Sequence, residues 1–101
     1  MTGRNIGYAR SAMRSQDIDL QITALKAAGC TDIYYDNGVS GTKLDRPGLS
    51  QARAALQSGD TLKVRDRARI SRSLPDFIAL RAEFREKGVQ VVELDAPENA
   101  W

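Results

Sequence analysis

The sequence predicts an α/β fold: a three-layer sandwich in which helices flank a mostly parallel sheet of four or five strands. Its 101 residues suffice for one domain with one core. Strand-like and helix-like segments alternate along the chain, four of the former and three of the latter. Such alternation is typical of a parallel sheet whose strands are joined by right-handed helical crossovers.

The first strand is expected over 6–10 and the first helix over 16–28. The helix is predicted by apolar residues at helical spacing, namely Ile18, Ile22, Leu25 and Ala28. Ser15 stands where an N-cap belongs, and Gly29 stands where a C-terminal glycine belongs.

The second strand is expected over 32–36. The loop 37–46 that follows is rich in turn residues and long for a connection of this kind, which favours a functional role. Pro47 then suits the first turn of a helix that ends at the turn formed by Gly59 and Asp60.

The third strand is expected over 61–64, and the last helix begins at Ser73 and closes at Gly88. Ser73 with an acid three residues on is a typical helix start. The expected buried face of this helix consists of Leu74, Phe77, Ile78, Leu80 and Phe84. The fourth strand is expected over 89–94.

Composition excludes several kinds of chemistry. The chain has no histidine, so it has no histidine base, no Ser-His-Asp triad and no histidine metal site. Its single cysteine, Cys30, allows no internal disulfide and is interpreted as a small core residue. No apolar run is long enough to span a membrane and no signal peptide is recognisable, so the cytoplasm is the expected compartment.

Positive charge is concentrated in the stretch 63–72. Five basic residues stand there against the single acid Asp66: Lys63, Arg65, Arg67, Arg69 and Arg72. Arginine dominates, as expected where planar, bidentate contact with phosphate is useful. A solvated basic face is one alternative. Another is a longer third strand that displays four of these side chains as a basic stripe, namely Lys63, Arg65, Arg67 and Arg69.

Arginines follow three strands of the predicted sheet. Arg10 ends the first strand, Arg46 ends the loop after the second, and Arg69 and Arg72 follow the third. Ligands of such sheets bind beyond the carboxyl ends of the strands. We therefore predict that these four arginines meet at one edge and grip a phosphodiester.

Six short segments occur in a consistent order and spacing: Ile6 to Arg10, Asp19 to Gln21, Ser40 to Thr42, Asp45 to Leu49, Gly59 to Leu62 and Arg69 to Ser73. Their combination, over roughly residues 4–94, resembles the catalytic domain of the serine recombinases, the resolvase and invertase family. The resemblance implies site-specific DNA recombination, in which a serine attacks a DNA phosphate and becomes joined to the strand. It implies no metal, nucleotide or other cofactor.

The resemblance also assigns site residues. Arg10, Arg46, Arg69 and Arg72 match the active-site arginines of the family. Residues expected near the DNA are Gln21, Asp36, Ser40, Lys43, Arg65 and Arg67. The implied partners are DNA and further copies of the chain, which would form a dimer or tetramer. The alternative is that a fragment of this length is a monomer. No membrane and no small-molecule substrate are expected.

This chain departs from the family pattern at three positions. Ala12 stands where the nucleophilic serine belongs, Ala68 where an aspartate belongs, and Asp66 where a lysine belongs. Ser11 is the alternative nucleophile, but on an extended strand it faces the opposite way. The prediction is thus a recombinase domain with impaired chemistry; the alternative is a catalytically silent domain that binds DNA or protein.

Residues 1–101 are expected to form this one domain, with a core over 4–94 and a tail over 95–101. The tail resembles neither the long dimerisation helix nor the helix-turn-helix domain of the family. We therefore expect the chain to contact DNA weakly and without reading its sequence.

Overall fold

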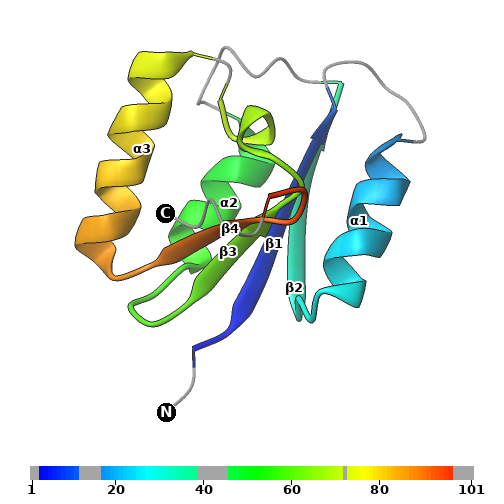
Figure 1. Ribbon diagram of the computed structural model, residues 1–101, viewed down its shortest axis with the longest axis horizontal. Helices are drawn as coiled ribbons and strands as arrows, with labels where there is room; N and C mark the ends of the chain where they lie inside the picture. The colour runs from blue at the N-terminus through cyan, green and yellow to red at the C-terminus, as the bar shows by residue number, and fades with distance from the viewer. Residues whose placement is uncertain (1–2, 12–16, 39–45, 72, 97–101) are drawn as a thin grey trace.

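Four parallel strands form one sheet in the order β2-β1-β3-β4 (Figure 1). The computed structural model describes residues 3–11, 17–38, 46–71 and 73–96. The elements are β1 (Asn5–Ser11), α1 (Asp17–Ala27), β2 (Asp32–Asn37), α2 (Pro47–Ala55), β3 (Thr61–Val64), the short 3₁₀ helix η1 (Arg67–Arg69), α3 (Leu74–Lys87) and β4 (Gln90–Glu93). Their order confirms the predicted alternation.

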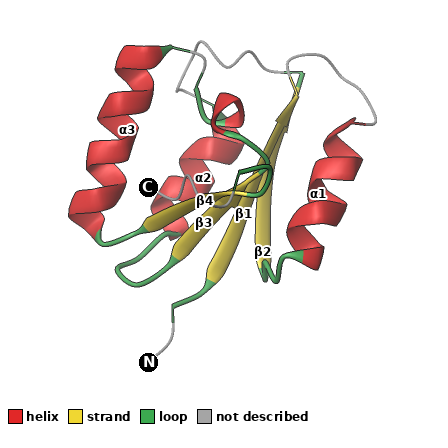
Figure 2. Ribbon diagram, in the orientation of Figure 1, coloured by secondary structure: helices red, strands yellow, loops and turns green. Residues whose placement is uncertain are grey.

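The helices cover both faces of the sheet, so the predicted three-layer arrangement is confirmed. Helix α1 lies on one face, and α2 and α3 lie on the other (Figure 2). Alternation along β1 sends Ile6 and Tyr8 toward α2 and α3, and Ala9 toward α1. No helix in the described ranges is long and apolar enough to cross a membrane.

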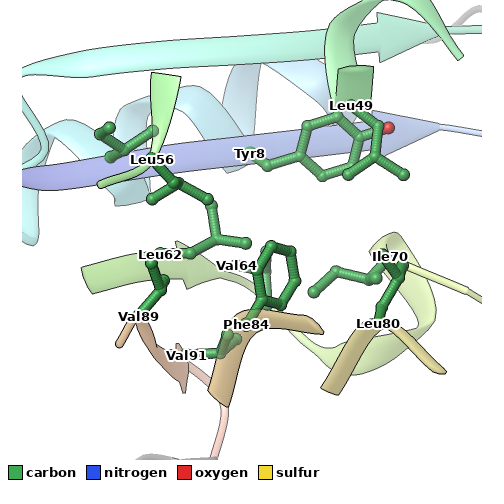
Figure 3. Close-up of a cluster of buried hydrophobic side chains, with 11 residues drawn as sticks. Tyr8, Leu49, Leu56, Leu62, Val64, Ile70, Leu80, Phe84, Val89 and Val91 are labelled. Carbon is green, nitrogen blue, oxygen red and sulfur yellow. The ribbon is translucent and has the colours of Figure 1, made fainter. Parts of the chain in front are cut away.

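The larger core lies between the sheet and the pair α2 and α3. Figure 3 shows side chains of both helices meeting those of the strands, with Phe84 of α3 close to Val64 of β3. The buried members of this core are Ile6, Tyr8, Leu49, Leu56, Leu62, Val64, Ile70, Leu80, Phe84, Val89 and Val91. A smaller cluster under α1 contains Ala9, Ile18 and Leu25, with the half-buried Cys30 packed against it.

The predicted buried face of α3 is partly wrong. Leu80 and Phe84 are buried, but Leu74 and Ile78 are 65% and 56% exposed. At roughly 100° per residue, Leu74 and Ile78 lie about 120° and about 160° around the helix from Leu80. The helix therefore carries apolar residues on two sides, and only one side faces the sheet.

Helix α2 ends at Ala55, earlier than the turn at Gly59 predicts. Leu56 leaves the helix and is buried in the larger core. The turn is held by Asp60, whose carboxylate accepts hydrogen bonds from the main-chain N–H groups of Gln57 and Arg4 over 2.9 and 2.8 Å. Asp60 thereby fixes the start of β3 against the segment that leads into β1.

The interpretation of the basic stretch as a longer third strand is wrong. Strand β3 stops at Val64, and Arg67–Arg69 form the helical turn η1. The basic side chains of the stretch do not share one face: Lys63, for example, donates to the main-chain carbonyl of Ala28 at the end of α1 over 2.6 Å. Because β1 pairs with β3 only as far as Gly7, the carboxyl end of β1 has no neighbouring strand on this side, and η1 packs there instead (Figure 1).

Candidate functional site

Arg10, near the end of β1, holds η1 with its guanidinium group. Its Nε donates to the carbonyl of Arg69 over 3.1 Å, and its Nη2 donates to the carbonyl of Ala68 over 2.8 Å. The residue is only 1% exposed. The main chain of η1, rather than solvent, therefore surrounds this positive charge.

Arg46, which precedes α2, reaches the same turn. Its Nη1 donates to the carbonyl of Arg69 over 3.1 Å, and its Nη2 donates to the carbonyl of Ile70. Its guanidinium carbon lies 5.6 Å from the centre of the Tyr8 ring, a cation–π arrangement. Arg46 is fully buried, and this burial lowers the pKa of its guanidinium group.

A buried acid lies beneath these arginines. Asp36, near the end of β2, accepts a hydrogen bond from the Tyr8 hydroxyl over 2.7 Å. It also accepts the N–H groups of Gly48 and Leu49 over 2.8 and 3.0 Å, which satisfies the first turn of α2. Burial and the hydrogen bond to Asp36 raise the pKa of Tyr8, which keeps this phenol neutral. Asp36 thus fixes α2 to the sheet.

Gln21 of α1 completes the edge of β1 where β3 has turned away. Its side-chain amide accepts the N–H of Arg10 over 3.1 Å and donates to the Arg10 carbonyl over 2.9 Å. The amide also donates to Asp17 over 2.8 Å. Gln21 is 1% exposed, so the structure gives it a positioning role; the expectation that it touches DNA stays a prediction.

Arg69 is the most accessible of the three gathered arginines, with 17% of its side chain exposed. Its Nη1 donates to the carbonyl of Arg10 over 2.8 Å, and its Nε donates to Asp66 over 3.2 Å. Within the described ranges, its Nη2 has no hydrogen-bond partner. The site is therefore layered, with Arg46 and Arg10 buried beneath the turn and Arg69 reaching the surface.

A family model provides the decisive comparison. The model described as "Resolvase, N terminal domain" matches residues 5–100. The chain belongs to the resolvase N-terminal domain family. This is the serine recombinase catalytic domain, as the resemblance of its motifs predicts.

Relatives of this resolvase domain include invertases and resolvases. It is 48% identical over 84 residues to the serine recombinase gin of Escherichia phage Mu, covering 83% of this chain and 43% of the relative. It is 42% identical over 83 residues to the DNA-invertase hin of Salmonella typhimurium, covering 82% and 43% respectively. The chain thus spans less than half the length of these relatives.

Solved structures agree with this assignment. The N-terminal catalytic domain of TP901-1 integrase is similar with a TM-score of 0.79 and 28% identity, over 93% of this chain and 79% of that one. A serine recombinase from Sulfolobus solfataricus shares the fold with a TM-score of 0.78 at 21% identity, over 93% and 69%.

The remaining predicted residues of this resolvase domain fall in several places. Ser11 is buried at the end of β1. Since Ser11 alternates with Arg10, it belongs to the α1 face, opposite the arginine cluster. Ala68 contributes its main-chain carbonyl to that cluster. Four predicted residues lie outside the described residues: Ala12, Ser40, Lys43 and Arg72.

Arg65 and Arg67 point to different sides of the turn. Arg65 pairs with Asp17 of α1 over 2.8 Å. Arg67 is exposed, lies over the ring of Phe77 at 5.4 Å and lines a hollow of about 190 Å³ at the start of α3. In the part of the chain that the structure describes, no ion pair involves Arg67, so it adds an open positive charge beside Arg69.

Sequence reasoning missed the role of Asp66, which it treats only as a departure from the family. The structure makes Asp66 the carboxylate that pairs with Arg69, three residues along. The spacing of three is a helical signal, and the strand-like alternation of this stretch hides it.

Proposed function

We propose that this chain is the DNA-contacting catalytic domain of a site-specific recombinase, with impaired strand cleavage. The observation that carries the proposal is the convergence of Arg10, Arg46 and Arg69 from three segments at one edge of the sheet. Such convergence fixes the turn η1 and presents the guanidinium of Arg69 at the surface, where it suits the concentrated negative charge of a phosphodiester. The relatives include enzymes named serine recombinase and DNA-invertase, which supports DNA as the partner.

In this proposal the three arginines have different roles. Arg69 touches the phosphate, because its Nη2 is unpartnered among the described residues and its side chain reaches the surface. Arg10 and Arg46 hold the turn that carries Arg69, since four of their N–H groups point at carbonyls of residues 68–70. Arg67 adds a second, more peripheral phosphate contact.

The impairment follows from the sequence. The resemblance places the attacking serine at position 12, where this chain has alanine, and a methyl group cannot attack phosphorus. Ser11 belongs to the opposite face of β1 from Arg10, which favours impairment over substitution. The missing aspartate at position 68 removes a second group of the implied site.

A covalent adduct tests the chemistry. Supercoiled DNA carrying a recombination site is incubated with the chain joined to the DNA-binding part of an invertase relative, followed by denaturing gel electrophoresis. We expect no protein–DNA adduct from the native catalytic sequence, and an adduct from the Ala12→Ser, Ala68→Asp double variant. An adduct from the native sequence that disappears in Ser11→Ala would show that Ser11 attacks and that cleavage is intact.

Salt-dependent binding tests the DNA contact. We expect Arg69→Ala to weaken binding of a short duplex and to lower the slope of log K against log salt by about one. Arg53→Ala is the matched control, because Arg53 forms an ion pair with Glu83 between α2 and α3. An equal loss of DNA affinity in both variants would show that only the net charge of the protein matters. That result would contradict a phosphate site at Arg69.

If the chain binds DNA but neither the native sequence nor the Ala12→Ser, Ala68→Asp double variant forms an adduct, the alternative holds. The domain is then catalytically silent and acts only by binding DNA or protein. The dimer or tetramer implied by the resemblance belongs to the active form of the proposal, and sedimentation of the DNA complex measures it.

A further inference from the structure

Six residues, Arg69 among them, form a closed ring of hydrogen bonds. Within it, the Arg69 guanidinium binds the main chain of Arg10 and the carboxylate of Asp66 over 2.8 and 3.2 Å. Asp66 also accepts from Arg65 over 3.3 Å, and Arg65 donates to Asp17 over 2.8 Å. The ring closes because Asp17 and the Arg10 carbonyl both accept from the same amide nitrogen, that of Gln21.

The ring leaves Arg69 with little capacity for a phosphate. A guanidinium binds a phosphate best through two parallel N–H groups on one edge. Asp66 takes Nε and the Arg10 carbonyl takes Nη1, so each edge of Arg69 has lost one donor. Only Nη2 lacks a partner among the described residues. Arg69 as arranged therefore offers a single nitrogen.

We propose that Asp66 is an internal counter-anion that occupies Arg69 and sets how tightly this arginine binds a DNA phosphate. The proposal deepens the proposed function and rests on it. Asp66 stands where the family resemblance implies a lysine, so the local charge differs by two units from that pattern. A carboxylate at this place both removes a donor and repels the incoming phosphate.

The ring explains why this pair matters more than an ordinary surface ion pair. An isolated exposed pair contributes little to stability and rearranges easily. Here Asp66 is held by Arg65 as well, and Arg65 is itself held by Asp17 of α1. The carboxylate is thus fixed on Arg69 from two sides, and a phosphate must compete with it.

The first experiment uses inorganic phosphate and needs no DNA. The Nε–H resonance of Arg69 is followed by NMR during titration of the native chain and of Asp66→Asn. We expect phosphate to bind at Arg69 about three- to tenfold more tightly in the variant, as removal of one nearby like charge implies. Asp66→Ser provides a second version of the change. Equal phosphate affinity in all three proteins would overturn the proposal.

The second experiment uses a short DNA duplex. Asp66→Asn should gain affinity by a similar factor, and the gain should vanish when Arg69→Ala is also present. Glu83→Gln is the matched control, because Glu83 is also paired with an arginine but lies on α3. A gain that persists without Arg69, or an equal gain in Glu83→Gln, would overturn the proposal.

The two experiments distinguish the counter-anion role of Asp66 from the DNA contact of Arg69. If phosphate affinity rises in Asp66→Asn while Arg69→Ala leaves DNA binding unchanged, Asp66 is a counter-anion and the proposed DNA contact is wrong. If Arg69→Ala weakens DNA binding while Asp66→Asn changes neither affinity, the DNA contact stands and the counter-anion is wrong.

Discussion

The Nη1 of Arg46 donates a hydrogen bond to the main-chain carbonyl of Arg69 over 3.1 Å, and Arg10 donates to the same oxygen at the same distance. One carbonyl of η1 thus accepts two guanidinium groups. Arg10 and Arg46, which the family resemblance assigns to a phosphate, therefore also hold η1 in place.

Arg46→Ala should lower the free energy of unfolding by about 2–4 kcal/mol, because the buried carbonyl of Ile70 loses a charged donor and a cavity forms over Tyr8. Arg46→Lys should recover little of the loss, since an ammonium cannot reproduce the planar contact with two carbonyls. Urea unfolding measures both variants. A loss no larger than that of the surface variant Arg53→Ala would contradict the role of Arg46.

Gln21→Glu should destabilise the fold by about 2–4 kcal/mol at neutral pH. A carboxylate cannot donate to the Arg10 carbonyl, and it repels Asp17, to which the Gln21 amide donates over 2.8 Å. Gln51→Glu on the exposed side of α2 makes the same chemical change and should have little effect. Thermal unfolding compares the two variants, and equal melting temperatures would contradict the pairing of Gln21 with β1.

Gly48→Ala should cost about 3 kcal/mol or more, because overpacking against backbone cannot be relieved by a rotamer change. A Cβ at Gly48 would lie 2.2 Å from the carbonyl oxygen of Tyr35 and 2.9 Å from Asp36. Gly59→Ala is the comparison: it meets no atom within 4 Å but has a φ of +94°, so it should cost about 1 kcal/mol. If the two variants unfold at the same urea concentration, α2 does not approach β2 as closely as described.

Asp60→Asn should destabilise the fold by about 1–3 kcal/mol at neutral pH, with a difference that shrinks in acid. The N–H groups of Arg4 and Gln57 hold the pKa of Asp60 below its usual value of 3.8. Because the folded pKa is depressed, the stabilisation is present above the unfolded pKa and is lost as pH falls through the folded one. Urea unfolding at neutral pH and near about pH 3 measures the change; a constant difference would contradict the assignment.

The fold was predictable because local signals agreed with one another. The order of strands correctly brought Arg10, Arg46 and Arg69 to one edge. The face of α3 was not predictable from apolarity alone, since Ile78 is as apolar as Leu80 and only packing against the sheet distinguishes them.

The burial of the arginines and their hydrogen-bond partners were not predictable either. Whether Arg10 faces solvent or main chain depends on how the chain turns after Val64, and the sequence there suits a strand as well as a turn. Strand alternation would place Asp66 on the opposite face from Arg69. The 3₁₀ turn instead brings them together, three residues apart.

Arg10 and Arg46 match the active-site arginines of the family and also hold η1 in place, which has an evolutionary consequence. A chain that stops cutting DNA still needs Arg10 and Arg46 to keep η1 in place, so purifying selection on folding alone would preserve them. Position 12, which the resemblance assigns to the nucleophile, holds alanine in this chain. The presence of Arg10 and Arg46 in such a chain therefore indicates a maintained fold, whereas positions 12 and 68 indicate whether the chemistry was kept.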